Sequence, residues 1–386
     1  MGVFTYFFFI VCGVSALFIA LGFKYRYSII AFFLSFTFIE LMDKTNYLNH
    51  YYFISLLSFL MIFLPAAANY SVDAYTRSIN TYRYIPRWTI DSVKLLIGVV
   101  YFYAGLAKLQ PDWLLDAMPL KIWLPARYDL PFLGNLLQET WVHYAFSWGG
   151  ALYDLTIPFL LLNKKTRVFA FVMVVIFHML TRVLFPIGMF PYIMIVSSLI
   201  FFDAKVHNTI LNWLSNFLRL DKARFFSEAK LTYKNTIGTK VRNGILIGFF
   251  MLQILIPFRF LLYPGHLFWT EQGYRFSWRV MLMEKAGYAN FKVVDAKSGK
   301  RFYVDNLDFL TVQQEKMMST QPDMILQYAH FLEDHFNSQG HKNLEIYVES
   351  FVALNGRRSR PFIDPERNLL KIEESFRHKD WILPFE

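Results

Sequence analysis

The sequence predicts an all-α membrane protein with about eight transmembrane helices and re-entrant or interfacial helices, followed by a small C-terminal α+β extramembrane domain. Of its 386 residues, 55% are hydrophobic, 19% are aromatic and only 18% are charged, which is too apolar for a soluble protein of this size. The apolar residues gather in successive runs, several of which reach the roughly 17–25 residues that cross a bilayer as a helix. From residue 263 onward such runs stop.

The first apolar run, residues 3–23, has neither a basic segment before it nor a clear cleavage site. We therefore expect a retained helix rather than a signal peptide. Further runs lie near residues 27–42, 51–68, 89–108, 144–162, 168–186, 187–203 and 241–262. Several are close to the minimum length for a span, which predicts short and kinked helices. The break at Pro186–Gly188 also allows the sixth and seventh runs to form one broken helix.

The net charge of +10 lies mostly in short segments between the runs, and no aromatic-basic nucleic-acid motif occurs, so we expect no nucleic-acid partner. Lys and Arg accumulate in alternate connections, namely 24–26, 77–87, 164–167 and 204–240. Because basic residues concentrate in the cytoplasmic loops of membrane proteins, this pattern puts both termini and the C-terminal domain outside.

Two connecting segments are predicted to carry helices of their own. Residues 109–143 contain Trp113, Trp123 and Trp141 among four prolines, which is typical of short re-entrant or interfacial helices that cap a cavity. Residues 205–235 combine helical apolar periodicity with basic residues, so we expect them to lie along the cytoplasmic surface.

The C-terminal region has the patterns of a mixed domain. Residues 292–304 predict a strand, a turn and a strand, and residues 311–336 predict a helix that breaks at Pro322. A second hairpin is predicted from 344–354, the turn Asn355-Gly356, and 360–363. The predicted domains are therefore a polytopic transmembrane domain, residues 1–262, and an α+β extracytoplasmic domain, residues 263–386.

One lysine stands at the end of the fourth run. Tyr101, Gly105 and Lys108 are spaced i, i+4, i+7, so a helix places them on one face. A lysine near hydrocarbon costs roughly 2.5–3.5 kcal/mol on insertion scales, so it needs a partner, a water-filled cavity or a function. The alternative is that the amine snorkels to the lipid headgroups.

The predicted topology gathers four polar groups on the outer side of the membrane. They are Asn49-His50, Lys108, His178 with Arg182, and Tyr274 with its neighbours. His50 alone, or His178 with Arg182, could be a structural polar patch, but ionisable residues from separate segments at one depth favour a membrane pocket. We expect no metal, because Cys12 is the single cysteine and zinc, di-iron and phosphate-loop motifs are missing from the sequence.

Four blocks of residues occur in the order found in the vitamin K-dependent γ-glutamyl carboxylases, and the chain resembles that family. The blocks are Asp43-Lys44-Thr45 with Asn49-His50, residues 101–113 (YFYAGLAKLQPDW), Phe177-His178 with residues 184–192 (LFPIGMFPY), and Trp269-Thr270 with residues 274–278 (YRFSW). The resemblance covers residues 40–280 and weakens after them.

This resemblance implies an enzyme that joins vitamin K epoxidation to a carbon–carbon lyase-type reaction. A reduced vitamin K, menaquinol or phylloquinol, is oxidised by O2 to the epoxide, and the strong base formed on the way removes a glutamyl γ-proton so that CO2 adds and γ-carboxyglutamate forms. The implied partners are membrane lipid, a glutamate-containing peptide or protein, and a quinone reductase that recycles the epoxide. The implied location is a bacterial inner membrane, with the active site and C-terminal domain outside.

The resemblance also assigns roles to individual residues. It makes Lys108 the base for the hydroquinone, which requires a neutral amine, and burial favours the neutral form. Asn49 and His50 complete the catalytic set by holding the hydroquinone oxygens. The cofactor-binding residues are Tyr101, Phe190, Met194, Met281 and His178. The substrate-binding residues are Gly188, Trp269, Tyr274, Ser277 and Trp278, of which Tyr274 could contact either the glutamate carboxylate or the quinone.

The chain departs from the family in three ways. It is shorter than the animal members, its one cysteine excludes their disulfide, and Met283 stands where they carry a histidine. Quinone oxidation is therefore better supported than carboxylation. The alternatives are a quinol epoxidase of the same fold without carboxylation, and a non-catalytic membrane binding or transport protein. A transport protein of the second kind is expected to consist of two inverted halves. The sequence shows no such internal symmetry.

Overall fold

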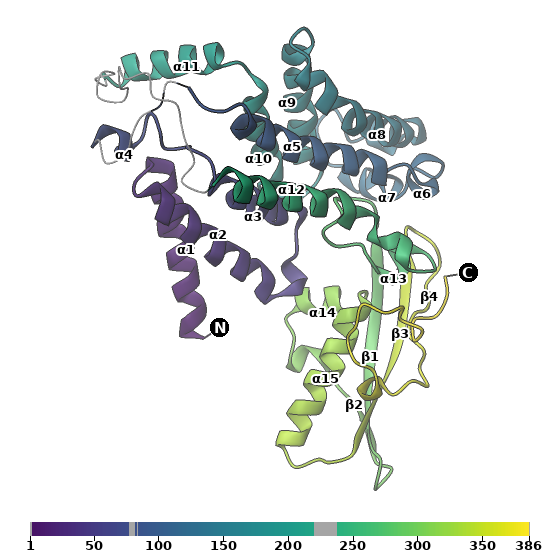
Figure 1. Cartoon of the computed structure of the whole chain (residues 1–386). Helices are drawn as coiled ribbons and strands as arrows, with labels where there is room; N and C mark the ends of the chain where they lie inside the picture. Colours follow the sequence, from purple (N-terminus) through teal and green to yellow (C-terminus); the bar gives the residue numbers. More distant parts are fainter. Residues whose placement is uncertain (1, 77–81, 83, 220–237, 386) are drawn as a thin grey trace. The chain divides into compact units, whose positions relative to one another are not determined.

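A computed structural model describes residues 2–76, 82, 84–219 and 238–385 (Figure 1). The chain divides into two compact units, each made of two separate stretches. Unit 1 contains Met1–Gly105 and Leu152–Ile254, and unit 2 contains Leu106–Ala151 and Leu255–Glu386. The predicted domain boundary between residues 262 and 263 stays a prediction.

Six helices within the described residues are long and apolar enough to cross a membrane. They are α1 (Val3–Leu21), α2 (Tyr25–Met42), α5 (Trp88–Ala107), α8 (Thr140–Leu162), α9 (Arg167–Leu184), and α12 (Thr239–Leu255) continued by the 3-10 helix η6 (Ile256–Leu262). This confirms the predicted fold class, a mostly helical membrane protein with a C-terminal sheet.

Two of the eight predicted spans differ from the structure. The run 51–68 forms α3 (Asn49–Met61), whose 13 residues extend only about 20 Å at 1.5 Å per residue. Pro65 follows in the same run and cannot donate a helical hydrogen bond. The run 187–203 forms α10 (Phe190–Ser198) and η4 (Leu199–Phe201), which are bent by 115° from the next helix. The described residues therefore hold six candidate spans, or seven if that bent pair is one span.

The helix after this bend is α11 (Ala204–Phe217), which lies in the segment predicted to be an amphipathic surface helix. Trp213 and Phe217, one turn apart, stack with ring centroids 5.9 Å apart. The helix is confirmed to residue 217, while the predicted continuation through 220–235 lies outside the described residues. The cytoplasmic location of this segment stays a prediction.

Within unit 1, one buried carboxylate joins distant parts of the chain. Asp73, on the short helix α4 (Val72–Tyr75), accepts hydrogen bonds from the backbone N–H groups of Lys24 (2.8 Å) and Tyr25 (2.9 Å). These are free donors at the start of α2, where a negative charge is favourable. The contact fixes the turn between α1 and α2, which lie side by side in Figure 1.

In unit 2, the proline-rich segment after α5 is broken into short pieces, as predicted. These are α6 (Pro111–Leu114), α7 (Leu120–Trp123), η2 (Pro125–Arg127) and η3 (Leu136–Gln138). The remaining short helices within the described residues are η1 (Lys44–Asn46), α13 (Leu267–Thr270), η7 (Asn306–Asp308) and η8 (Leu369–Lys371).

The C-terminal part of unit 2 is a four-stranded antiparallel sheet with the order β2-β1-β3-β4. The strands are β1 (Lys285–Asp295), β2 (Arg301–Tyr303), β3 (Leu344–Leu354) and β4 (Arg360–Pro361). The helices α14 (Val312–Met318) and α15 (Pro322–Ser338) confirm the predicted break at Pro322. Both predicted hairpins are present, because β1 pairs with β2 and β3 pairs with β4.

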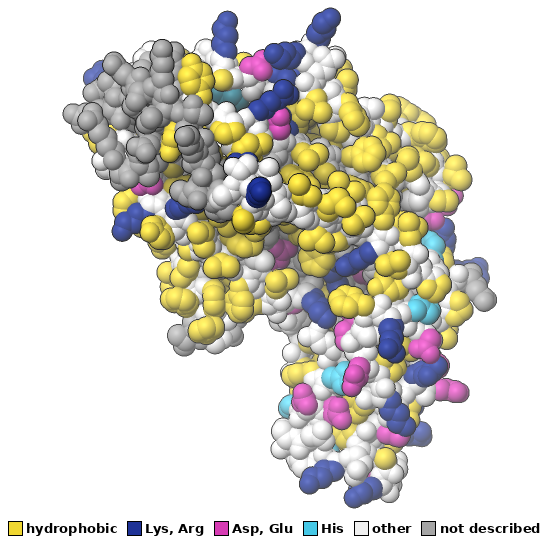
Figure 2. Space-filling view, viewed as in Figure 1, with side chains coloured by type: hydrophobic (Ala, Val, Ile, Leu, Met, Phe, Trp, Pro, Cys, Tyr) yellow, Lys and Arg dark blue, Asp and Glu magenta, His cyan; other side chains and the backbone are white. Residues whose placement is uncertain are grey.

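One face of this sheet is buried against α15. The side chains of Ala289, Phe291 and Val293 alternate along β1 and are buried, and the ring of Phe291 packs edge-on against Tyr328 of α15. Figure 2 shows broad hydrophobic areas over the long helices, whereas Asp and Glu gather mainly in the lower region that holds β1–β4, α14 and α15. The two surfaces match a bilayer and an aqueous environment.

Candidate functional site

Two predicted cofactor-binding residues of unit 1 form a direct hydrogen bond. The hydroxyl of Tyr101, on α5, lies 2.9 Å from Nε2 of His178, on α9. The two side chains are almost fully buried, with 3% and 1% of their surface exposed. Seventy-seven residues separate them in the sequence, so the helix packing brings them together.

Phe190, the first residue of α10, joins this pair to His50 at the start of α3. Its ring centroid lies 5.7 Å from that of His178 and 5.9 Å from that of His50. Met194, also predicted to bind the cofactor, is fully buried one turn further along α10. The structure therefore brings four of the predicted site residues of unit 1 into one cluster.

Two flanking residues complete the predicted set in this unit. Asn49 directly precedes His50, and its side-chain oxygen accepts a hydrogen bond from the Tyr47 hydroxyl at 3.2 Å. Gly188 has a φ of +59° in the turn before α10. That conformation favours glycine, because a side chain would be strained there.

Tyr153 and Phe177 extend the cluster and were not among the predicted site residues. Their rings stack with centroids 4.0 Å apart and an angle of 16° between the planes. The Tyr153 ring also lies 6.0 Å from Tyr101 and 6.4 Å from His178, centroid to centroid. We call the group His50, Tyr101, Tyr153, Phe177, His178 and Phe190 the aromatic cage. Tyr153 carries no signal that separates it from ordinary core residues, whereas Phe177 directly precedes His178 in one of the blocks that resemble the family.

The aromatic cage contains one buried polar atom, Nδ1 of His178, that has no hydrogen-bond partner among the described residues. The Tyr153 hydroxyl, also buried, interacts with the hydroxyl of Tyr101. An unsatisfied buried polar group costs about 1–3 kcal/mol, so such atoms are expected to meet a ligand. Flat apolar rings with a few polar groups among them are the residue types that suit a quinone ring and its oxygens.

The predicted base, Lys108, belongs to unit 2 and directly follows the last residue of α5. It is only 6% exposed, and its Nζ lies 5.3 Å from the ring centroid of Trp113. The amine is thus enclosed by protein. The snorkelling alternative requires an amine that extends to the surface, so the structure argues against it.

The motif after Lys108 explains how Trp113 is held. Pro111 starts α6, where its missing N–H is tolerated, and the Gln110 side chain accepts a hydrogen bond from the Asp112 N–H at 3.0 Å. The indole of Trp113 donates to the carbonyl of Ser147 on α8 at 2.7 Å, and the Ser147 hydroxyl donates back to the Trp113 carbonyl. Ser147 therefore holds both the indole N–H and the backbone carbonyl of Trp113, which fixes the ring that faces the lysine.

Asp112 ties the same helix to the C-terminal sheet. Its carboxylate accepts two hydrogen bonds from Arg357, at 2.6 and 2.8 Å, and one from the Asn355 amide at 2.7 Å. Burial raises the pKa of the Asp112 carboxyl, but the hydrogen bonds from Arg357 and Asn355 outweigh this and hold the pKa below its ordinary value. The lysine-bearing segment and the β3–β4 turn are thus parts of one packed unit.

The predicted substrate residues of unit 2 lie on a buried loop with unusual backbone angles. Four residues that are not glycine have φ between +56° and +61°, namely Glu271, Phe276, Trp278 and Met281. Bulky residues rarely adopt this conformation, and such strain concentrates at functional sites.

Side-chain hydrogen bonds hold this loop in place. The Trp269 indole donates to the Leu383 carbonyl at 2.7 Å, and the Ser277 hydroxyl donates to the Gly273 carbonyl at 2.7 Å. The Tyr274 hydroxyl donates to the Arg279 carbonyl at the longer distance of 3.3 Å. Burial raises the pKa of the Tyr274 phenol, so this hydroxyl stays a proton donor.

A buried ion pair anchors the start of the same loop. Nζ of Lys285 donates to the Glu271 carboxylate at 2.8 Å and to the carbonyls of Trp269 and Thr320 at 2.9 and 3.1 Å. The two charged side chains are 4% and 7% exposed. No pattern in the sequence indicated this pair.

The predicted site residues thus form two groups. Asn49, His50, Tyr101, His178, Gly188, Phe190 and Met194 lie in unit 1, whereas Lys108, Trp269, Tyr274, Ser277, Trp278 and Met281 lie in unit 2. Their convergence on one catalytic centre stays a prediction. Among the described residues, no group of three or more His, Cys, Asp or Glu side chains could hold a metal ion.

Comparison with known protein families gives two matches that together cover most of the chain. Residues 2–205, more than half of the chain, match the HTTM domain. Residues 238–386 match the lumenal domain of vitamin K-dependent gamma-carboxylase. No solved structure matches the chain.

Proposed function

Because the chain belongs to the vitamin K-dependent γ-carboxylase family, we propose that it oxidises a reduced vitamin K, menaquinol or phylloquinol, and carboxylates glutamyl side chains. The observation that supports this proposal most is the aromatic cage of unit 1, with its hydrogen-bonded Tyr101–His178 pair and the unpartnered Nδ1 of His178. Its flat apolar walls suit a quinone ring, and its polar atoms suit the oxygens of that ring.

In this proposal, the cage residues hold and orient the ring. When bound, a reduced vitamin K supplies, through its oxidation by O2, the strong base that takes a proton from the glutamyl γ-carbon before CO2 adds. Asn49 and His50 hydrogen-bond the ring oxygens, and the bond to His178 fixes the Tyr101 side chain against the ring. The apolar rings exclude water from the reacting atoms.

Lys108 takes the proton from the hydroquinone hydroxyl at its Nζ. The ring face of Trp113, 5.3 Å from that atom, stabilises the ammonium that results. Because Trp113 is fixed through Ser147, this stabilisation requires no rearrangement. Burial of the lysine keeps competing water away from the amine.

The Trp269–Trp278 loop binds the glutamyl side chain of a peptide or protein. Tyr274 and Ser277 supply hydroxyls, and the two tryptophans supply buried walls. The protonated phenol of Tyr274 donates a hydrogen bond to the substrate carboxylate or to a quinone oxygen. The long bond from its hydroxyl to Arg279 is readily exchanged for a shorter one to a ligand.

The candidate spans support a location in a membrane. We propose a bacterial inner membrane, with the active site and the C-terminal domain outside. Lipid then surrounds the spans, and a quinone reductase returns the epoxide to the reduced form. The substrate meets the protein on the outer side.

Purified protein in detergent tests the proposal with reduced menaquinone, a short glutamate peptide and labelled CO2. We expect label to appear in the peptide and Lys108→Ala to remove it. Lys121→Ala is the matched control, because this lysine of the same unit also faces an aromatic ring, that of Tyr144. Epoxide without labelled peptide would instead favour a quinol epoxidase of the same fold. Full carboxylation by Lys108→Ala would contradict the assigned base.

A further inference from the structure

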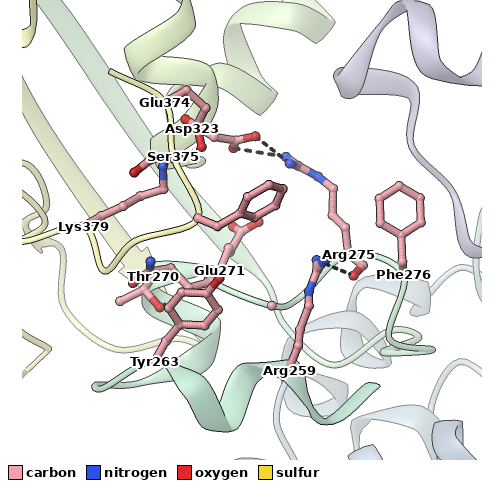
Figure 3. Close-up of a pocket in the computed structure, with 13 residues that line it drawn as sticks. Arg259, Tyr263, Thr270, Glu271, Arg275, Phe276, Asp323, Glu374, Ser375 and Lys379 are labelled. Atoms are coloured by element: carbon pink, nitrogen blue, oxygen red, sulfur yellow. Dashed lines mark hydrogen bonds and ion pairs between the residues drawn. The ribbon is translucent and has the colours of Figure 1, made fainter. Parts of the chain in front are cut away.

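Unit 2 contains a pocket that is separate from the predicted reacting atoms. It has a volume of about 210 Å³ and is lined by η6, by the loop after α13 and by residues near the C-terminal end (Figure 3). The lining includes Thr270–Gly273, Arg275 and Phe276. It therefore flanks Tyr274 on both sides in the sequence, but Lys108, Tyr274 and Ser277 do not line it.

The carboxylates of this pocket are already neutralised. Three lining carboxylates each meet a cation at 2.6–2.8 Å, in the pairs Arg275–Asp323, Lys379–Glu374 and Lys285–Glu271. Figure 3 shows the first of these pairs across the pocket from Arg259. Each pair sums to zero charge, so these groups by themselves attract neither an anion nor a cation strongly.

Arg259 is the remaining cation that lines the pocket. Its Nη2 donates to the Arg275 carbonyl at 2.8 Å, while its buried Nε has no hydrogen-bond partner, and no described carboxylate pairs with it. Figure 3 shows its guanidinium pointing from η6 toward the pocket. Arg259 also stands near the end of the last candidate span, where an unpaired charge is costly unless it has a function.

We propose that this pocket binds a second carboxylate of the peptide substrate, an acidic side chain next to the glutamate that reacts. The inference rests on the proposed function, whose substrate is a glutamyl peptide. One uncompensated guanidinium suits one monoanion, and arginine binds carboxylates through two parallel hydrogen bonds. The loop that carries Tyr274 lines the pocket, so a neighbouring residue of the same peptide is within reach.

Peptides that differ in one carboxylate test this inference. Each carries one target glutamate and, at a nearby position, either a second glutamate or glutamine. Dissociation constants are measured by fluorescence anisotropy with full-length protein in detergent, without turnover, and KM and kcat are measured for carboxylation. For the best-placed second glutamate we expect about tenfold tighter binding than for its glutamine counterpart, the usual size of a charge-assisted hydrogen bond.

Arg259→Gln should remove this tenfold difference and leave the glutamine peptide bound as before, with kcat unchanged. Arg259→Lys keeps the charge but loses the paired hydrogen bonds, so it should restore only part of the difference. The matched control is Arg301→Gln, which removes an exposed arginine from β2 of the same unit and should preserve the difference in full.

Three results would overturn the inference. The first is equal binding of the two peptides at every position, and the second is a difference that survives in Arg259→Gln. The third is loss of the phosphatidylglycerol that stays bound to the detergent-purified protein in Arg259→Gln, without an effect on peptides, which would assign the pocket to a lipid headgroup. If the protein bound the two peptides differently but fixed no CO2, the result would support the pocket and contradict the carboxylase activity.

Discussion

The two units build their candidate sites with different chemistry. In unit 1, aromatic rings and the hydrogen-bonded pair of Tyr101 and His178 form a buried cluster without a charged side chain among its defining residues. In unit 2, buried ion pairs fix the segments that carry Lys108 and Tyr274. A flat redox lipid requires apolar walls, whereas a reactive amine and a charged substrate require local charges that are individually compensated.

This difference makes the two units respond differently to substitution. Removing one partner of a buried ion pair leaves the other charge uncompensated, which is more costly than losing one neutral hydrogen bond. Substitutions in unit 2 should therefore reduce stability first. Substitutions in the aromatic cage should reduce quinol binding while the fold persists.

The largest loss of stability is expected for Lys285→Ala. It leaves the Glu271 carboxylate, which is 7% exposed, without its cation, and should lower the free energy of unfolding by about 3–5 kcal/mol. Urea titration in detergent, followed by tryptophan fluorescence, measures the change. Arg367→Ala removes an exposed ion pair of the same unit and should change the free energy by about 0.5 kcal/mol or less. Equal losses in the two variants would show that burial of the pair does not matter.

Asp112→Ala should destabilise unit 2 somewhat less, by about 2–4 kcal/mol. The smaller effect follows because the Arg357 side chain is 37% exposed and water can solvate its unpaired charge. Asp116→Ala is the control, since this carboxylate is 55% exposed and 3.7 Å from the same arginine. The same urea titration measures both variants. If Asp116→Ala were as unstable as Asp112→Ala, the contact between Asp112 and Arg357 would not be what stabilises the unit.

The same carboxylate should make stability depend on pH. Burial raises the folded-state pKa of Asp112, but the hydrogen bonds from Arg357 and Asn355 lower it by more, so it lies below the ordinary value of 3.8. The ionised Asp112 carboxylate therefore contributes fully to the free energy of unfolding well above pH 3.8. This contribution is lost as the pH falls through the lowered pKa. Wild-type unfolding free energy should fall more steeply below about pH 4 than that of Asp112→Asn. Parallel curves for the two proteins would assign the acid sensitivity to other groups.

The smallest effect is expected in the aromatic cage. Tyr101→Phe keeps the ring but removes the hydrogen bond to His178, which contributes about 1 kcal/mol and corresponds to an approximately fivefold higher KM for the quinol. The free energy of unfolding should also fall, by about 1 kcal/mol, because the buried Nε2 of His178 loses its hydrogen-bond partner. Tyr27→Phe, at a tyrosine that is 77% exposed, serves as the control. An unchanged quinol KM in Tyr101→Phe would remove this bond from cofactor binding.

Local patterns were sufficient for most of the secondary structure. Long apolar runs predicted the six candidate spans, and Pro322 and Asn355-Gly356 marked a helix break and a hairpin turn that the structure contains. The predicted span over residues 51–68 was wrong because the apolar residues continue past Met61 toward Pro65, whereas the helix ends at Met61. Apolarity measures burial or membrane contact and does not by itself fix helix length.

Long-range partners were beyond reach of the sequence. Asp112 and Arg357 are separated by 245 residues, and no local pattern couples them. Tyr153 resembles any other aromatic residue in an apolar run until the helices are packed. The residues that could be predicted, among them Lys108, His50 and Tyr274, were found through the resemblance to a family. Their chemistry alone also allowed structural roles.

The central claim is that the buried amine of Lys108 starts the oxidation of a reduced vitamin K. Mass spectrometry of the quinone products, after purified protein is mixed with menaquinol and O2, tests it most directly. The account predicts epoxide from the wild type and from Lys121→Ala, and only background oxidation from Lys108→Ala. Epoxide formation at the wild-type rate by Lys108→Ala, or no epoxide from the wild type, would contradict it.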